Sequence, residues 1–115
     1  MRKFVIAGMV LMGGVVSAQT IEPVLEADGK MVKATYFHEN GKVNQQGHFL
    51  DGKPEGKWIM FDELGNKKAV AHYATGEKTG KWYFFSGNTV SEVDYSDNRV
   101  AAVKNYSKDA LVVRE

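Results

Sequence analysis

Short runs rich in β-branched and aromatic residues alternate with residues that favour tight turns along most of this chain. Within each run, successive side chains would point to opposite faces of a strand. Outside a short turn at 107–113, the chain after residue 18 lacks the period of about 3.6 residues that marks a helix. The pattern predicts strands over residues 23–27, 31–38, 43–50, 57–61, 68–73, 81–85, 89–95 and 100–106.

The segments between these runs carry Gly, Asn and Asp, which accept positive φ and close tight hairpins. They are Asp28-Gly29, Asn40-Gly41, Asp51-Gly52, Leu64-Gly65-Asn66, Thr75-Gly76, Gly87-Asn88 and Asp97-Asn98. Because each turn joins two adjacent runs, consecutive strands should be antiparallel neighbours. The sequence therefore predicts an all-β fold, an antiparallel β-hairpin meander.

A repeat with a period of 24 residues organises this meander. Residues 47–58 return as residues 71–82, with His, an aromatic residue, two glycines, Lys and Trp in the same places. A third copy is two residues shorter and lacks the Gly-Lys-Trp ending, as terminal repeats often do. The turn glycines of the repeats are Gly41, Gly52, Gly56, Gly65, Gly76 and Gly80.

Both faces of the predicted sheet carry large side chains. Successive side chains of a strand point to opposite faces, so each tryptophan lies on one face and the large residue that follows it lies on the other. We predict a candidate interaction surface made of Trp58, Trp82, Tyr83 and Phe85. Packing between strands is the favoured role of the two tryptophans, with a ligand platform as the alternative. The open edge strands of such a sheet are a second candidate for interaction, because they could pair with a strand of a partner or of a second copy of this chain.

The residues of these units resemble a known family. The unit Tyr36-x-x-x-Asn40-Gly41-Lys42, continued by Gly47-x-Phe49-x-x-Gly52-x-x-x-Gly56-Lys57-Trp58, is similar to the bacterial variant of the MORN repeat. A second unit runs through Gly80-Lys81-Trp82, and the resemblance covers about residues 31–106. It implies a β-hairpin scaffold for contacts with proteins or surfaces, without catalysis.

Some relatives in this family are labelled antitoxins, and others nicotinate-mononucleotide adenylyltransferases. The adenylyltransferase chemistry needs a His-x-Gly-His phosphate site at the start of a helix, and His38, His48 and His72 have no such context. We therefore disfavour that label. An antitoxin-like component of a toxin–antitoxin pair is kept as the alternative function.

No other catalytic or metal-binding pattern stands out. Residues 52–58 have one residue too few between the glycines for a phosphate loop, and Trp follows the lysine where Ser or Thr is needed. His48 and His72 should lie roughly 10 Å apart, because each repeat is two strands of about 4.8 Å, and this is too far to share a zinc ion. We predict no enzymatic activity, no cofactor and no metal site.

The first eighteen residues differ from the rest. Arg2 and Lys3 precede an apolar run over residues 4–16, and Val16-Ser17-Ala18 forms a small-residue cleavage site. The run is shorter than the about 20 residues that span a membrane. We predict a signal peptide over 1–18, an extension with the first hairpin strand over 19–30, repeats over 31–106 and a tail over 107–115. The protein should be exported, and periplasmic or secreted.

Charge and cysteine content exclude further classes of function. The chain has 15 basic and 14 acidic residues, and losing Arg2 and Lys3 with the signal leaves 13 basic residues against the same 14 acids. This balance argues against nucleic acid as a partner. The absence of cysteine excludes disulfides and thiol chemistry.

Several lysines lie near the repeat loops and could make a weak contact with an anionic surface, although acids are interleaved with them. They are Lys53, Lys57, Lys67, Lys68, Lys78 and Lys81. Taken together, the sequence predicts an exported, non-enzymatic β-hairpin repeat protein. It would act as a protein-interaction or structural module in the cell envelope, with a protein partner.

The signal peptide is tested by the mass of the protein recovered from cells that express the full chain. Cleavage after Ala18 should give the intact mass of residues 19–115, because the small-residue site is where a signal peptidase cuts. A recovered protein that keeps Met1 would contradict the prediction.

Overall fold

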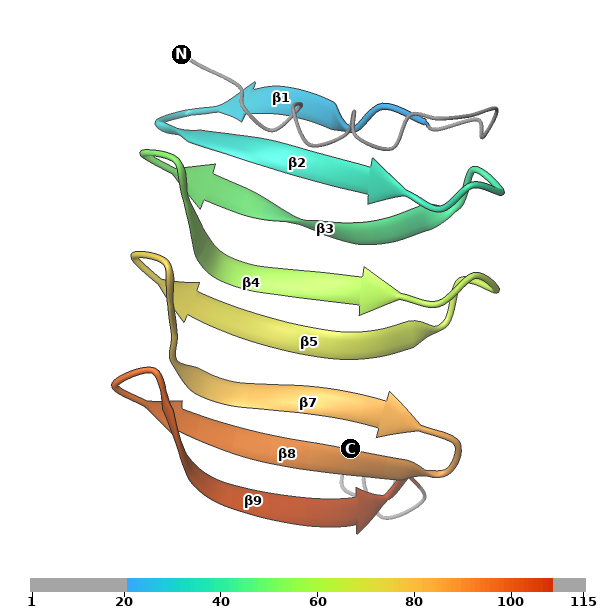
Figure 1. Cartoon of the computed structure of the whole chain (residues 1–115), viewed down its shortest axis with the longest axis vertical. Helices are drawn as coiled ribbons and strands as arrows, with labels where there is room; N and C mark the ends of the chain where they lie inside the picture. The colour runs from blue at the N-terminus through green and yellow to red at the C-terminus, as the bar shows by residue number, and fades with distance from the viewer. Residues whose placement is uncertain (1–20, 109–115) are drawn as a thin grey trace, which may run out of the picture.

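A computed structural model describes residues 21–108, which form one antiparallel sheet (Figure 1). Its strands are β1 Val24–Asp28, β2 Met31–Phe37, β3 Val43–Leu50, β4 Lys53–Phe61, β5 Lys67–Ala74, β6 Glu77–Lys78, β7 Gly80–Ser86, β8 Thr89–Ser96 and β9 Arg99–Ser107. They lie side by side in the order β1-β2-β3-β4-β5-β7-β8-β9, with the short β6 also paired to β5. The predicted all-β hairpin meander is confirmed.

The turns between the strands have the backbone geometry that their residues favour. At Asp51-Gly52 and Asp97-Asn98, both central residues have positive φ, which matches the twist of the strands they join. The six repeat glycines also have positive φ: Gly41 91°, Gly52 80°, Gly56 75°, Gly65 95°, Gly76 83° and Gly80 67°.

One predicted boundary is wrong. The sequence pattern starts a strand at residue 57 and leaves 52–56 in the hairpin loop, but β4 already begins at Lys53. The turn is confined to Asp51-Gly52, and β3 pairs with both halves of β4: His48 with Glu55, and Gln46 with Ile59. Residues 56–58 therefore form a bulge opposite a single residue, Gly47, and Figure 1 shows β4 bending near its start.

The second repeat has the same bulge. There β5 pairs with β6 through Tyr73 and Lys78, and with β7 through Val70 and Tyr83. The third copy, which lacks Gly-Lys-Trp, has one extra residue, since Asp94 pairs with Ala102 and Tyr95 with Val100. The Gly-Lys-Trp ending thus accompanies the larger bulge. Its glycine adopts positive φ there, a conformation that a side chain would disfavour.

Each bulge allows a tryptophan to fold over the sheet. Trp58 and Trp82 are 5% and 4% exposed and form the core cluster with Ala34 and Ala71. The indole Nε1–H of Trp58 donates to the carbonyl oxygen of His48 at 3.1 Å. Trp82 makes the equivalent bond to the carbonyl oxygen of His72 at 3.0 Å. The two repeats therefore share one packing unit.

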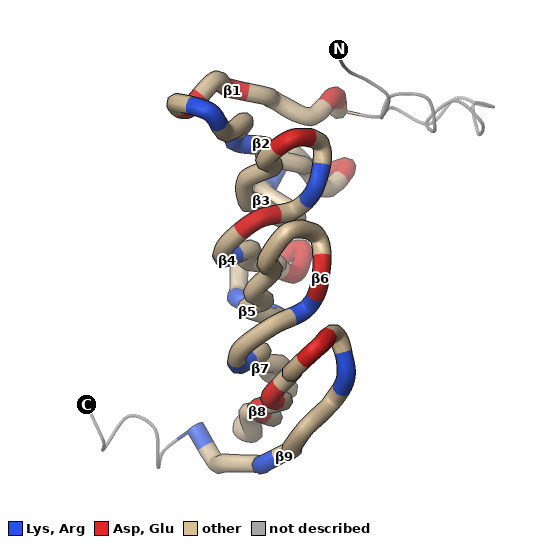
Figure 2. The backbone as a smooth tube through the Cα atoms, turned by 90° about the vertical axis from the view of Figure 1, so that its left-hand side faces the viewer, with Lys and Arg blue, Asp and Glu red and all other residues tan. Residues whose placement is uncertain are grey.

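Neighbouring repeats are also joined through their loops. At one end of the strands, His38 Nε2–H donates to the carbonyl oxygen of Phe61 at 2.9 Å. At the other end, the Gly76 amide donates to the carbonyl oxygen of Pro54 at 3.0 Å and the Thr75 amide to Glu55 Oε1 at 2.7 Å. Seen from the side, the linked repeats form one narrow column of strands (Figure 2).

Among residues 21–108, no helix is long and apolar enough to cross a membrane. The predicted signal peptide, residues 1–18, lies outside the described residues. The tail predicted over 107–115 is described only through residue 108.

The packing of Trp58 over Gly47 predicts the effect of a single methyl group. A Cβ atom at residue 47 would overlap the indole ring, so the ring or the bulge must shift. We expect Gly47→Ala to lower the free energy of unfolding by about 1–3 kcal/mol in chemical denaturation.

The cost of Gly47→Ala should be smaller in a Trp58→Phe background, because the smaller ring leaves room for the methyl group. An equal cost in both backgrounds would contradict the proposed overlap.

Candidate interaction surface

The structure divides the four predicted surface residues between two faces of the sheet. Trp58 and Trp82 are buried on one face, whereas Tyr83 and Phe85 are partly exposed on the other. The division follows from strand geometry, because neighbouring residues of β7 point in opposite directions. The burial of the indoles supports the packing role of the tryptophans. Binding by Tyr83 and Phe85 stays a prediction.

Tyr83 and Phe85 belong to a larger group of apolar side chains that we call the outer band: Ile59, Phe61, Val70, Tyr83 and Phe85. Strand pairing brings Ile59 next to Val70, and Val70 next to Tyr83. All five are partly exposed. Every strand within residues 21–108 belongs to the same sheet, so no second layer of strands in that segment lies over the band. At its β7 end, Lys108 Nζ lies 5.9 Å from the centroid of the Phe85 ring, and Val90, which pairs with Phe85, is buried. Exposed apolar groups of this kind are typical of interaction sites.

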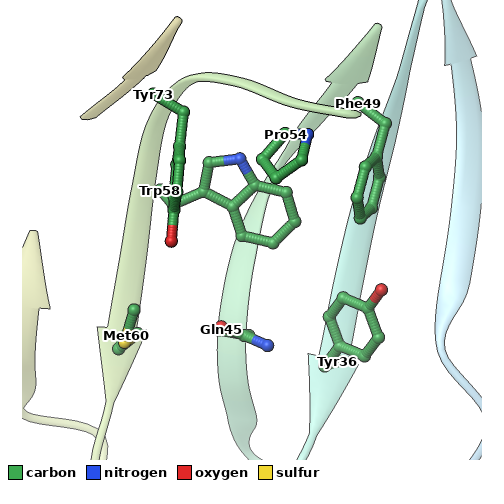
Figure 3. A pocket seen from close by; sticks show the side chains of 7 residues that line it. All are labelled: Tyr36, Gln45, Phe49, Pro54, Trp58, Met60 and Tyr73. Carbon is green, nitrogen blue, oxygen red and sulfur yellow. The ribbon is translucent and has the colours of Figure 1, made fainter. Parts of the chain in front are cut away.

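The opposite face carries an aromatic pocket of about 210 Å³ beside Trp58 (Figure 3). Its walls come from strands β2 to β5, and the residues are Tyr36, Gln45, Phe49, Pro54, Trp58, Met60 and Tyr73. The predicted surface includes Trp58 but none of the six other residues that line this pocket. The available signal was the repeat alignment, in which Pro54 takes the place of Lys78.

One ring contact of each tryptophan is equivalent in the two repeats. The centroids of Phe49 and Trp58 are 5.1 Å apart with the planes at 76°. Those of Tyr73 and Trp82 are 5.2 Å apart at 69°. These edge-to-face arrangements are favourable for aromatic pairs. Burial raises the pKa of both the Tyr36 and Tyr73 hydroxyls, so both stay neutral and protonated near pH 7.

The histidines make local hydrogen bonds. His48 Nε2 lies 2.9 Å from Asp28 Oδ2, and His72 Nδ1–H donates to the carbonyl oxygen of Lys81 at 3.0 Å. Within residues 21–108, no group of three or more His, Cys, Asp or Glu residues could hold a metal ion. The repeated histidines thus have contacts within the sheet.

One ion pair lies on the same face as the outer band. Lys81 Nζ donates to Glu92 Oε2 at 2.9 Å, and Glu92 is 8% exposed. The hydrogen bond from Lys81 holds the pKa of Glu92 below its ordinary value, against the opposing effect of burial. The same contact raises the pKa of Lys81. Elsewhere, acidic and basic positions are interspersed along the chain (Figure 2). The weak contact with an anionic surface stays a prediction.

Comparison with protein families matches residues 32–51 to the MORN repeat variant. This segment covers almost all of β2, all of β3 and the first residue of the turn that follows. The match supports the MORN-variant resemblance, and MORN repeats are non-catalytic modules that mediate interactions. Comparisons with curated proteins and with solved structures gave no significant match.

The Lys81–Glu92 pair predicts a pH dependence of stability. Because the pKa of Glu92 is lower in the folded chain than its ordinary value of 4.5, the pair stabilises the fold above that pH. This contribution is lost as the pH falls through the folded pKa. In denaturation experiments, Glu92→Gln should be less stable than the wild type at neutral pH, and the difference should shrink below about pH 4.5.

Lys81→Met removes the other partner and should show the same convergence with the wild type in acid. If the difference in stability between either variant and the wild type stays constant from neutral to acidic pH, the stabilising role assigned to the Lys81–Glu92 pair is contradicted.

Proposed function

We propose that this chain is an exported, non-enzymatic β-hairpin repeat protein that acts as a protein-interaction or structural module in the cell envelope. The observation that carries the proposal is the outer band, a set of partly exposed apolar side chains on a face that no second layer of strands within residues 21–108 covers. Burying such a surface against a partner removes it from water, which lowers the free energy of the complex.

The use of the repeated residues supports a non-enzymatic role. The glycines sit in turns and bulges, and the tryptophans are buried. The repeated histidines, His48 and His72, are hydrogen-bonded within the sheet. The recurring glycines, tryptophans and histidines thus take part in contacts that hold the fold together. The match to an interaction repeat points the same way.

The location in the envelope rests on the sequence alone. The basic start, the apolar run and the site at Val16-Ser17-Ala18 have the form of a secretory signal. No contact in the described residues favours the antitoxin alternative, so it stays a prediction from the family resemblance.

Site-specific photo-crosslinking in living cells tests the interaction role. A photoreactive phenylalanine analogue at Tyr83, in the outer band, should give an adduct of defined mass, because a bound partner would lie against that side chain. The matched control is the same analogue at Lys42, an exposed position in the loop between β2 and β3.

The protein identified in the adduct should then bind the purified chain. Its affinity should fall about tenfold or more in a Tyr83→Ser, Phe85→Ser double variant that keeps its fold, since two aromatic contacts are lost. Equal adducts from both positions, or unchanged affinity of the folded double variant, would overturn the assignment of the outer band.

A further inference from the structure

The two repeats differ at one position beside their tryptophans. Counted by the 24-residue period, Pro54 in the first repeat corresponds to Lys78 in the second. The residues around them correspond as well: Trp58 to Trp82, and Tyr73, on the following strand, to Tyr95. This difference decides what each aromatic site contains.

In the second repeat, the site is filled by a cation from the chain itself. Lys78 Nζ lies 5.2 Å from the centroid of the Trp82 ring and 5.2 Å from that of Tyr95. The centroids of these two rings are 5.1 Å apart. An ammonium group at this distance is attracted by the negative faces of the rings. The aromatic environment of the repeat is therefore suited to an ammonium group.

In the first repeat, no such lysine is present. Pro54 is short and uncharged, and the aromatic pocket of about 210 Å³ lies next to Trp58 and Tyr73. Figure 3 shows Pro54 near one end of this pocket, with Phe49 and Tyr36 on the side away from Tyr73. The Gln45 amide adds a polar group to the lining.

We propose that this pocket is a binding site for an alkylammonium group, which would take the place that Lys78 Nζ occupies in the second repeat. The rings of Trp58 and Tyr73 bind the cation, and Tyr36 and Phe49 enclose its alkyl groups. The cation can belong to a lysine side chain of a partner protein or to a quaternary ammonium compound. This site is on the face opposite the outer band, so it is independent of the proposed function.

Nuclear magnetic resonance of the ¹⁵N-labelled protein tests the site directly, because its two indole N–H signals report separately on Trp58 and Trp82. The probes are Nα-acetyl-lysine methylamide and choline, each compared with its uncharged analogue, Nα-acetyl-norleucine methylamide or 3,3-dimethylbutan-1-ol. We expect a saturable shift of the Trp58 signal with at least one cation, about fivefold weaker with its uncharged analogue. The cation that binds more tightly identifies the source of the group.

Exchanging the residues at the two equivalent positions gives matched variants. Pro54→Lys should place an ammonium group in the first site and abolish the shift, while Pro54→Ala should retain it. Lys78→Ala should make the Trp82 signal respond to the cation as well. Its backbone amide can still donate to Asn98 Oδ1, as Lys78 does at 2.9 Å.

Three results would overturn the proposal: no response of Trp58 to either cation in the folded wild type, equal responses to the charged and uncharged probes, or an unchanged response in folded Pro54→Lys. Each of these leaves the crosslinking test of the outer band unaffected, since that test uses the other face and another ligand.

Discussion

The fold depends on a tryptophan that packs back over its own sheet. A single-layer sheet has no second layer against which to bury apolar surface, so each repeat must cover one face with its own side chains. Trp58 and Trp82 do this from a bulge, and each indole N–H is satisfied by a histidine carbonyl oxygen. Removing a buried Trp side chain costs about 3–5 kcal/mol, against about 5–15 kcal/mol for the whole stability of a small domain. Two such residues therefore account for much of the stability of this chain.

This packing makes the two faces of the sheet different. The tryptophan face has a buried cluster that includes Ala34 and Ala71, together with the aromatic rings around it. The other face keeps the partly exposed outer band and the Lys81–Glu92 pair. Hydrogen bonds from loop residues of one repeat to β4 of the neighbouring repeat link the strands at both ends. A scaffold with one face covered by its own tryptophans and a partly exposed apolar band on the other is suited to contact with partners, and the repeats hold both faces in a fixed orientation.

The departures from the repeat give the chain its individual sites. Pro54 leaves an aromatic pocket where Lys78 fills the equivalent position with an ammonium group. The missing Gly-Lys-Trp in the third copy leaves β9 without a covering indole, and Val100 and Val103 there are both 56% exposed. This strand is also the last in the strand order of residues 21–108, which makes it an edge strand of the sheet. The self-association predicted for open edges has its most exposed apolar candidate here, and it stays a prediction.

The sequence by itself determined the turns, the alternation of faces and the order of the strands. These are local properties, because positive φ at Gly, Asn and Asp and the two-residue period of a strand need no distant partner. It did not determine that β4 begins at Lys53, since that requires β3 to pair on both sides of the bulge. Nor could it show that Trp58 and Trp82 are buried while Tyr83 and Phe85 stay partly exposed, because burial depends on how the bulge turns the indole. Only the tertiary structure brings Lys78, Trp82 and Tyr95 together from strands β6, β7 and β8. This contact gives a meaning to the Pro54 for Lys78 difference between the repeats, which the alignment alone does not supply.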